Sequence, residues 1–151
     1  MNMLFPTALL APLLLLSGCG QGSQKPEAKV RGAWVRLPAA PSGTGAGYFE
    51  AEANTKGEAL VSAAAPGARV EMHESMTMNH MASMQPIASA AFQDGKLTFA
   101  PGGKHLMIFG LDPKLKSGAT VPLSLRFRAA PPVTVEARLV GAGDPAPGDE
   151  G

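Results

Sequence analysis

The segment TVPLSLRFR, residues 120–128, carries an apolar side chain at every second position, namely Val121, Leu123, Leu125 and Phe127. The segment VTVEARLV, residues 133–140, repeats this spacing with Val133, Val135, Ala137 and Leu139. Successive side chains of a β-strand point to opposite sides, so this alternation is typical of a strand with one buried face. The two segments therefore predict two amphipathic strands.

Short runs of the same character recur along the chain, separated by Gly, Pro, Asn and Asp, and no segment sustains a helical apolar period for three turns. Further strands are expected at residues 29–37, 45–53, 58–65, 69–75, 96–100 and 104–110. Asp94-Gly95 is the favoured dipeptide of a type I′ hairpin turn, because both central residues need positive φ. Residues 76–92 fit a loop, a short irregular strand, or both. The pattern predicts an all-β single domain, an antiparallel β-sandwich of about eight strands.

The N-terminal region resembles a lipoprotein leader. LFPTALLAPLLLL, residues 4–16, has the length of a signal-peptide apolar region and is too short for a membrane span. LSGC, residues 16–19, resembles the bacterial lipobox, whose cysteine receives lipid and becomes the new N-terminus. We expect a lipoprotein signal peptide at 1–18, lipidated Cys19 and a flexible tether at 19–28, the folded domain at 29–141 and a flexible acidic tail at 142–151. An incidental cysteine in an ordinary secretory signal is the alternative.

Composition and residue types argue against several classes of function. The 151 residues carry a formal net charge of +1 with scattered Lys and Arg, which argues against a nucleic-acid partner. The sequence shows no Ser/His/Asp ordering, no paired carboxylates in a matching context and no phosphate-binding loop, so we do not expect an enzyme. Cys19 is the only cysteine, which leaves no thiolate for a disulfide or for a blue-copper electron-transfer centre.

Methionine and histidine gather in one tract. VEMHESMTMNHMASM, residues 70–84, contains five of the eight methionines and two of the three histidines. Methionine often fills irregular cores, but the other expected strands use Val, Leu, Phe and Ala, and this tract is polar between its methionines. Thioether and imidazole donors together favour Cu(I). His105 and Met107 lie two apart on an expected strand, so both project to one face and can meet one ion.

Four of these residues resemble the signature of the PCuAC periplasmic copper chaperones: His, ten residues, Met, twenty-one residues, His, any residue, Met. Here the pattern is His73, Met84, His105 and Met107, with one residue fewer before His105. Residues 33–36 (AWVR), 47–49 (GYF) and 101–107 (PGGKHLM) also look like family positions.

This resemblance implies a cupredoxin-like β-sandwich that binds Cu(I) through His73, Met84, His105 and Met107. It also implies delivery to a copper acceptor, either the CuA site in cytochrome c oxidase subunit II or a CuA assembly factor. With the lipid on Cys19, the protein would be extracytoplasmic and anchored to a membrane, on the periplasmic or cell-envelope side.

The tract also holds donors that the signature does not use: Met72, Met76, Met78, His80 and Met81. They could form an accessory metal site, for Cu(I) or, through imidazole, for Cu(II). Periplasmic copper storage or resistance is then an alternative function. Solvated loop residues, or an apolar contact patch on a structural lipoprotein, are the readings without metal.

Overall fold

The computed structural model describes residues 24–148, so the expected signal peptide and Cys19 lie outside the described residues. The described part consists of strands and loops, and it contains no helix that could cross a membrane. The strands are β1 (Ala28–Arg36), β2 (Thr44–Ala53), β3 (Ala59–Ala64), β4 (Arg69–Met78), β5 (Met81–Pro86), β6 (Ala90–Ala91), β7 (Lys96–Phe99), β8 (Lys104–Phe109), β9 (Thr120–Phe127) and β10 (Val133–Val140).

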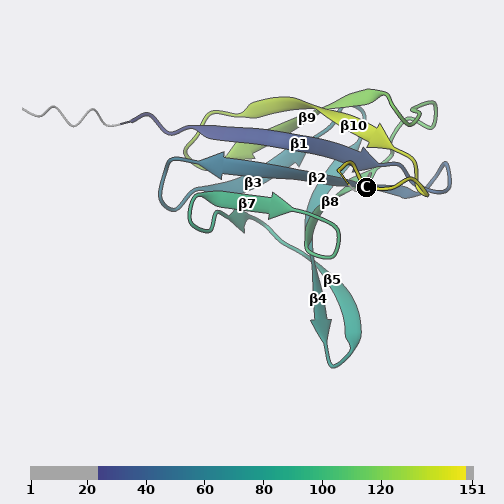
Figure 1. Cartoon of the computed structure of the whole chain (residues 1–151), viewed down its shortest axis with the longest axis horizontal. Coiled ribbons are helices and arrows are strands. Elements are labelled where there is room, and N and C mark those ends of the chain that lie inside the picture. Colours follow the sequence, from purple (N-terminus) through teal and green to yellow (C-terminus); the bar gives the residue numbers. More distant parts are fainter. Residues whose placement is uncertain (1–23, 149–151) are drawn as a thin grey trace, which may run out of the picture.

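The all-β, single-domain prediction is confirmed, with two differences. The strands follow the order β5-β4-β8-β2-β1-β10-β9-β3-β6, with β7 beside β2, and β1 runs parallel to β10 while the other pairs are antiparallel. Residues 24–148 form ten strands because residues 76–92, left open by the sequence, extend β4 and supply β5 and β6. Figure 1 shows the strands stacked into a flattened body from which the β4–β5 hairpin projects.

The predicted alternation builds the core. Leu123 and Leu125 of β9 and Leu139 of β10 are completely buried, while Ser124 and Arg126, on either side of Leu125, face solvent. The aromatic rings of Phe49 and Phe99, from β2 and β7, stack in the same core with centroids 4.6 Å apart. Burial of each of these large apolar side chains contributes about 1.5–3 kcal/mol to the free energy of folding, which determines the face of each long strand that turns inward.

A buried carboxylate ties the start of β3 to the loop after β9. Glu58 is almost fully buried and accepts hydrogen bonds from the backbone N–H groups of Ala59 (3.0 Å), Ala129 (3.0 Å) and Ala130 (2.8 Å). Burial by itself would raise the pKa of Glu58, but the backbone donors outweigh it and hold the pKa below its usual value. The ionised side chain therefore stabilises this corner of the fold.

Two tight turns have the same backbone geometry. Asp94 and Gly95 have φ of 49° and 75°, as predicted for a type I′ hairpin. Asn79 and His80, with φ of 51° and 64°, link β4 to β5 in the same way. Asparagine and histidine both tolerate this left-handed region, but Asn79-His80 lacks the glycine of the favoured turn dipeptides, which explains why the sequence did not reveal the second hairpin.

A small aromatic cluster lies outside the main core. The rings of Trp34 and Tyr48 are 4.4 Å apart and pack with Val140, with Ala46 and Ala146 at the margin. The Arg36 guanidinium lies over Trp34 and donates to the carbonyl oxygens of Gly141 (3.0 Å) and Asp144 (2.8 Å). The segment expected as a free tail therefore begins with residues that contact the domain.

Candidate metal centre

The register of three strands brings the four signature residues to one face of the sheet. In β4 and β8, His73 lies directly opposite His105, and Glu71 lies opposite Met107. In β4 and β5, Ser75 lies opposite Met84. Directly opposed residues share a face, as do residues two apart along one strand. His73, Met84, His105 and Met107 thus project to the same side, although β4 separates the strand of Met84 from that of His105.

The geometry within this group suits a shared ligand. The imidazole rings of His73 and His105 are 6.0 Å apart between centroids and inclined at 31°. Met84 is the diagonal neighbour of His73, a relation that spans roughly 7–8 Å between backbones and is within reach of a long side chain. His105 is buried and Met107 half-buried, whereas Met84 is 59% exposed. The group is closed on the β8 side and open to solvent at β5.

Hydrogen bonding selects the free nitrogen of His73. Its Nε2 lies 3.0 Å from Oε2 of Glu71, so Nε2–H donates to the carboxylate and Nδ1 keeps its lone pair. Nδ1 is buried and has no hydrogen-bond partner among residues 24–148. A buried polar atom without a partner costs about 1–3 kcal/mol, so a metal ion bound there would relieve a real penalty.

His105 is oriented in the complementary sense. Its Nδ1 lies 3.0 Å from the carbonyl oxygen of Gly103, which can only accept, so Nδ1 carries the proton. This leaves Nε2 with the lone pair. In its neutral form each imidazole is therefore held in one tautomer by a neighbour, which is the usual arrangement of histidines that bind metal.

The surplus donors of the tract do not join this group. Met72 is buried in the main core, on the face of β4 opposite to His73, where it packs as an ordinary apolar side chain. Met76, Met78 and Met81 also project to that opposite face, but beyond the core, where they are exposed. His80 lies in the turn at the tip of the hairpin.

Glu71 was missed by sequence reasoning, although a signal was available. It stands two residues before His73 on an expected strand, so the period of two already places both on one face. Its second carboxylate oxygen contacts the Arg69 guanidinium, which fixes the side chain. Glu71 is thus the residue that orients His73.

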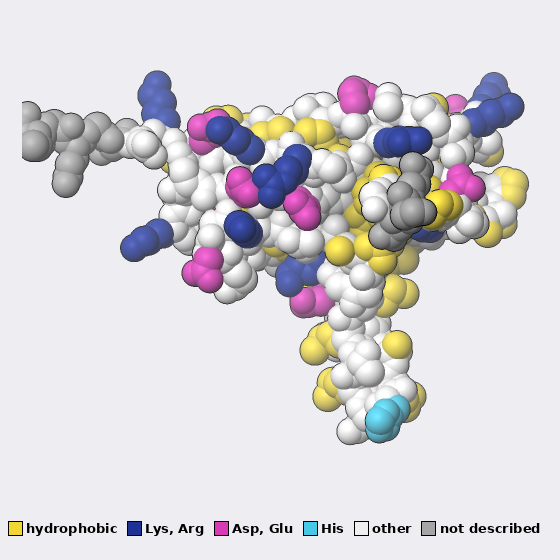
Figure 2. Space-filling model, viewed as in Figure 1, with side chains coloured by type: hydrophobic (Ala, Val, Ile, Leu, Met, Phe, Trp, Pro, Cys, Tyr) yellow, Lys and Arg dark blue, Asp and Glu magenta, His cyan; other side chains and the backbone are white. Residues whose placement is uncertain are grey.

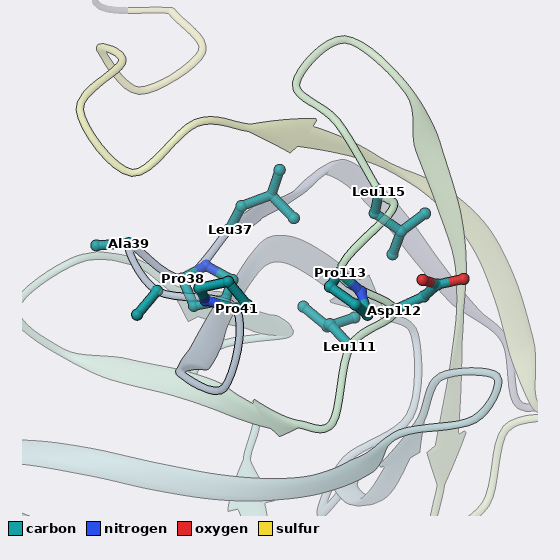
Figure 3. Close-up of a pocket in the computed structure, with 9 residues that line it drawn as sticks. Leu37, Pro38, Ala39, Pro41, Leu111, Asp112, Pro113 and Leu115 are labelled. Carbon is teal, nitrogen blue, oxygen red and sulfur yellow. The ribbon is translucent and has the colours of Figure 1, made fainter.

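A pocket elsewhere offers different chemistry. It lies between the turn after β1 and the loop after β8 and is lined mainly by Leu and Pro (Figure 3). Its one carboxylate, on Asp112, points away from the other lining residues in Figure 3, and Oδ1 accepts the backbone N–H of Lys114. No His or Met lines this pocket, so the strand face with His73 and His105 remains the candidate site.

The fold matches solved copper-domain structures. The chain is similar to the copper-bound PCuAC domain from PmoF2, with a TM-score of 0.62 at 19% identity, covering 76% of this chain and 93% of that one. It is also similar to the Cu(I) form of DR1885 from Deinococcus radiodurans, with a TM-score of 0.53 at 26% identity, covering 82% and 85%. The apo form of DR1885 matches at 27% identity with a TM-score of 0.54, over 93% and 94%. The cupredoxin-like PCuAC fold is thereby confirmed.

Sequence comparison identifies relatives over the same region. The protein described as "Putative lipoprotein Lxx21020" from Leifsonia xyli subsp. xyli (strain CTCB07) is 33% identical over an alignment of 140 residues, and the match covers 83% of this chain and 82% of that protein. The model of the family described as "Putative lipoprotein LpqE-like" matches residues 28–139, from the first strand almost to the end of the last. This chain therefore belongs to the LpqE-like lipoprotein family, with the fold of a PCuAC domain.

Proposed function

We propose that this protein is an extracytoplasmic copper chaperone that carries one Cu(I) ion on Nδ1 of His73, Nε2 of His105 and the sulfur atoms of Met84 and Met107. The observation that carries the proposal is the buried Nδ1 of His73, which has no partner among the described residues and shares a face with the other three donors. Two neutral nitrogens and two thioethers form a soft donor set of the kind that Cu(I) prefers.

The site is built for release as well as for binding. Met84 stands on β5, which is an edge strand, and its side chain is largely exposed. An acceptor can approach this edge and replace the thioether first, while the two imidazoles and Met107 still hold the ion. Transfer by stepwise ligand exchange needs such an open side, whereas a storage site would enclose its metal.

We infer that the acceptor is a copper site richer in thiolate or imidazole, namely the CuA site of cytochrome c oxidase or an assembly factor for it. The likeness to PCuAC domains supports this choice. We also propose that residues 1–18 are removed and that lipid on Cys19 holds the protein at the membrane. The family description as a lipoprotein and the LSGC sequence support that anchor.

Competition between the protein and a chromophoric Cu(I) chelator tests the proposal. M107L removes a sulfur atom and keeps a similar volume, so Cu(I) affinity should fall by an order of magnitude or more while the unfolding temperature stays nearly unchanged. M72L is the matched control, because Met72 projects to the other face of the same sheet, and it should bind as the unaltered protein does. Equal affinity of M107L and M72L would remove Met107 from the site.

A further inference from the structure

The outer half of the β4–β5 hairpin stands apart from the sheet. Pairing of β4 with β8 ends at Glu74, opposite Lys104, and beyond that point β4 pairs only with β5. The last backbone bond to the body runs from the Ser75 N–H to the carbonyl of Gly103. Figures 1 and 2 show the resulting ribbon extending well clear of the domain.

The composition of this ribbon is unusual for a free hairpin. Residues 75–93 contain no Asp, Glu, Lys or Arg, and Figure 2 shows the projecting ribbon with apolar and uncoloured side chains and a histidine near its end. It has no aromatic residue and only one β-branched residue, Thr77, between Met76 and Met84. Isolated two-stranded ribbons are marginal in water, and aromatic and β-branched pairs are what normally support them.

Three methionines share one face of the ribbon. Met78 lies directly opposite Met81 next to the turn, and Met76, two residues before Met78, lies opposite Ser83. Their side chains are 61%, 74% and 40% exposed, and with Met84 they are the large apolar side chains most exposed in residues 24–148. Met84 projects to the other face. The three sulfur atoms are thus separated from the His73 site by the thickness of the ribbon.

The geometry points to a second Cu(I) site, formed by Met76, Met78 and Met81. Directly opposed side chains begin about 4.5–5.5 Å apart, and flexible thioether chains can close that gap around one ion. Three neutral sulfur donors match a soft monovalent cation. The carboxylate on the same face, Glu74, is paired with Lys104 at 2.9 Å. An ion held there would join β4 to β5 and stabilise the ribbon, since a ligand that binds only the folded form adds to its stability.

His80 is not required in this site. Its positive φ takes it out of the alternation that aligns the three methionines, so the two-residue period does not place it on their face. The proposed site also shares no donor with the group around His73 and His105. The two sites can therefore be removed one at a time.

Anaerobic titration of the full chain in detergent with Cu(I), against a chromophoric chelator, tests the inference. The unaltered protein should take up about two ions per chain, and M76L/M78L/M81L about one, because leucine keeps the apolar volume but supplies no donor. H73A/H105A should also retain about one ion, with shifts of the Met76, Met78 and Met81 methyl signals in carbon-13 NMR. M72L is the control and should bind as the unaltered chain does.

If the unaltered chain and M76L/M78L/M81L each bind one ion, the second site is overturned and these methionines are an apolar contact surface. Two ions in M76L/M78L/M81L would overturn it as well. Loss of all binding in H73A/H105A would show that the ribbon holds no ion by itself. If H73A/H105A keeps the shifts of the methionine methyl signals and M76L/M78L/M81L binds only one ion, the ribbon site is supported independently of the proposed function at His73.

Discussion

Replacing Glu71 should weaken Cu(I) binding without removing any ligand. In E71A the His73 ring loses the carboxylate that holds Nε2–H, so the tautomer with a free Nδ1 is no longer enforced. A hydrogen bond to a charged group contributes about 1.5–3 kcal/mol. Because the Glu71 side chain is 38% exposed and that of His73 14%, the lower half of this range applies. About 1.5–2 kcal/mol corresponds to a loss of affinity of roughly 10–30-fold.

E71Q separates hydrogen bonding from charge. The glutamine oxygen can still accept from Nε2–H, and neutral hydrogen bonds are about half as strong as charged ones, so the loss should be about 3–5-fold. The matched control is E74A. Glu74 lies on the same strand with similar exposure, but it projects to the other face and pairs with Lys104 at 2.9 Å.

Competition with a chromophoric Cu(I) chelator measures all three variants, and nitrogen-15 spectra of the imidazoles report the His73 tautomer. The expected order of affinity is E74A equal to the unaltered protein, then E71Q, then E71A. An E71A variant that binds as tightly as E74A would refute the reasoning, because the carboxylate would then have no part in preparing the ligand.

Three further predictions concern the fold. In E58Q one backbone donor would face an amide N–H, so the free energy of unfolding at neutral pH should fall by about 1–3 kcal/mol. Urea denaturation measures this loss. Because the pKa of Glu58 is lowered in the folded state, its stabilising contribution is fully present above the ordinary pKa of a glutamate and is lost as the pH falls through the lower pKa of the folded protein. E58Q should therefore show a flatter acid profile, and an equal profile would contradict the carboxylate role. L123A should cost about 2–5 kcal/mol with an unchanged denaturant slope, because Leu123 is completely buried; a smaller loss would mean that the core collapses around the gap. G95A should lower the free energy of unfolding by about 1–2 kcal/mol, measured by thermal unfolding, since φ is 75° and an added Cβ would lie 3.0 Å from the Ala53 carbonyl oxygen. The control N79G, at the other turn, should leave the stability unchanged.

Alternation of apolar residues was sufficient to predict most of the fold. The bounds of β9 and β10 fall within a residue of the segments expected from Val121 to Leu139, because buried faces leave a period of two in the sequence. The same period cannot reveal strand direction, so the parallel pairing of β1 with β10 could not be read. The β4–β5 hairpin was also hidden, since Met, Ser and Ala are weak strand signals and Asn79-His80 is an uncommon turn pair.

The members of the candidate site were proposed from the sequence, whereas their geometry comes from the structure. The resemblance to the PCuAC signature pointed to His73, Met84, His105 and Met107. The two-residue period of a strand is enough to place His105 and Met107 on one face. Register is a property of pairing, so the direct opposition of His73 and His105 appeared only in the structure. The same alternation places Met76 and Met78 on the face of β4 opposite to His73. A search for metal-binding residue types alone overlooks this difference of face.

The aromatic cluster gives this molecule an optical reporter of its own. Trp34 is the only tryptophan in the chain, so the fluorescence of the protein above the tyrosine band comes from one buried indole. Ala46 touches that cluster on one side and is the cross-strand partner of Met107 on the other. Ala146, from the segment held by Arg36, closes the same cluster. We therefore expect the emission of Trp34 to respond both to Cu(I) at the proposed site and to departure of the C-terminal segment. A shift in wavelength would distinguish exposure of the ring from quenching.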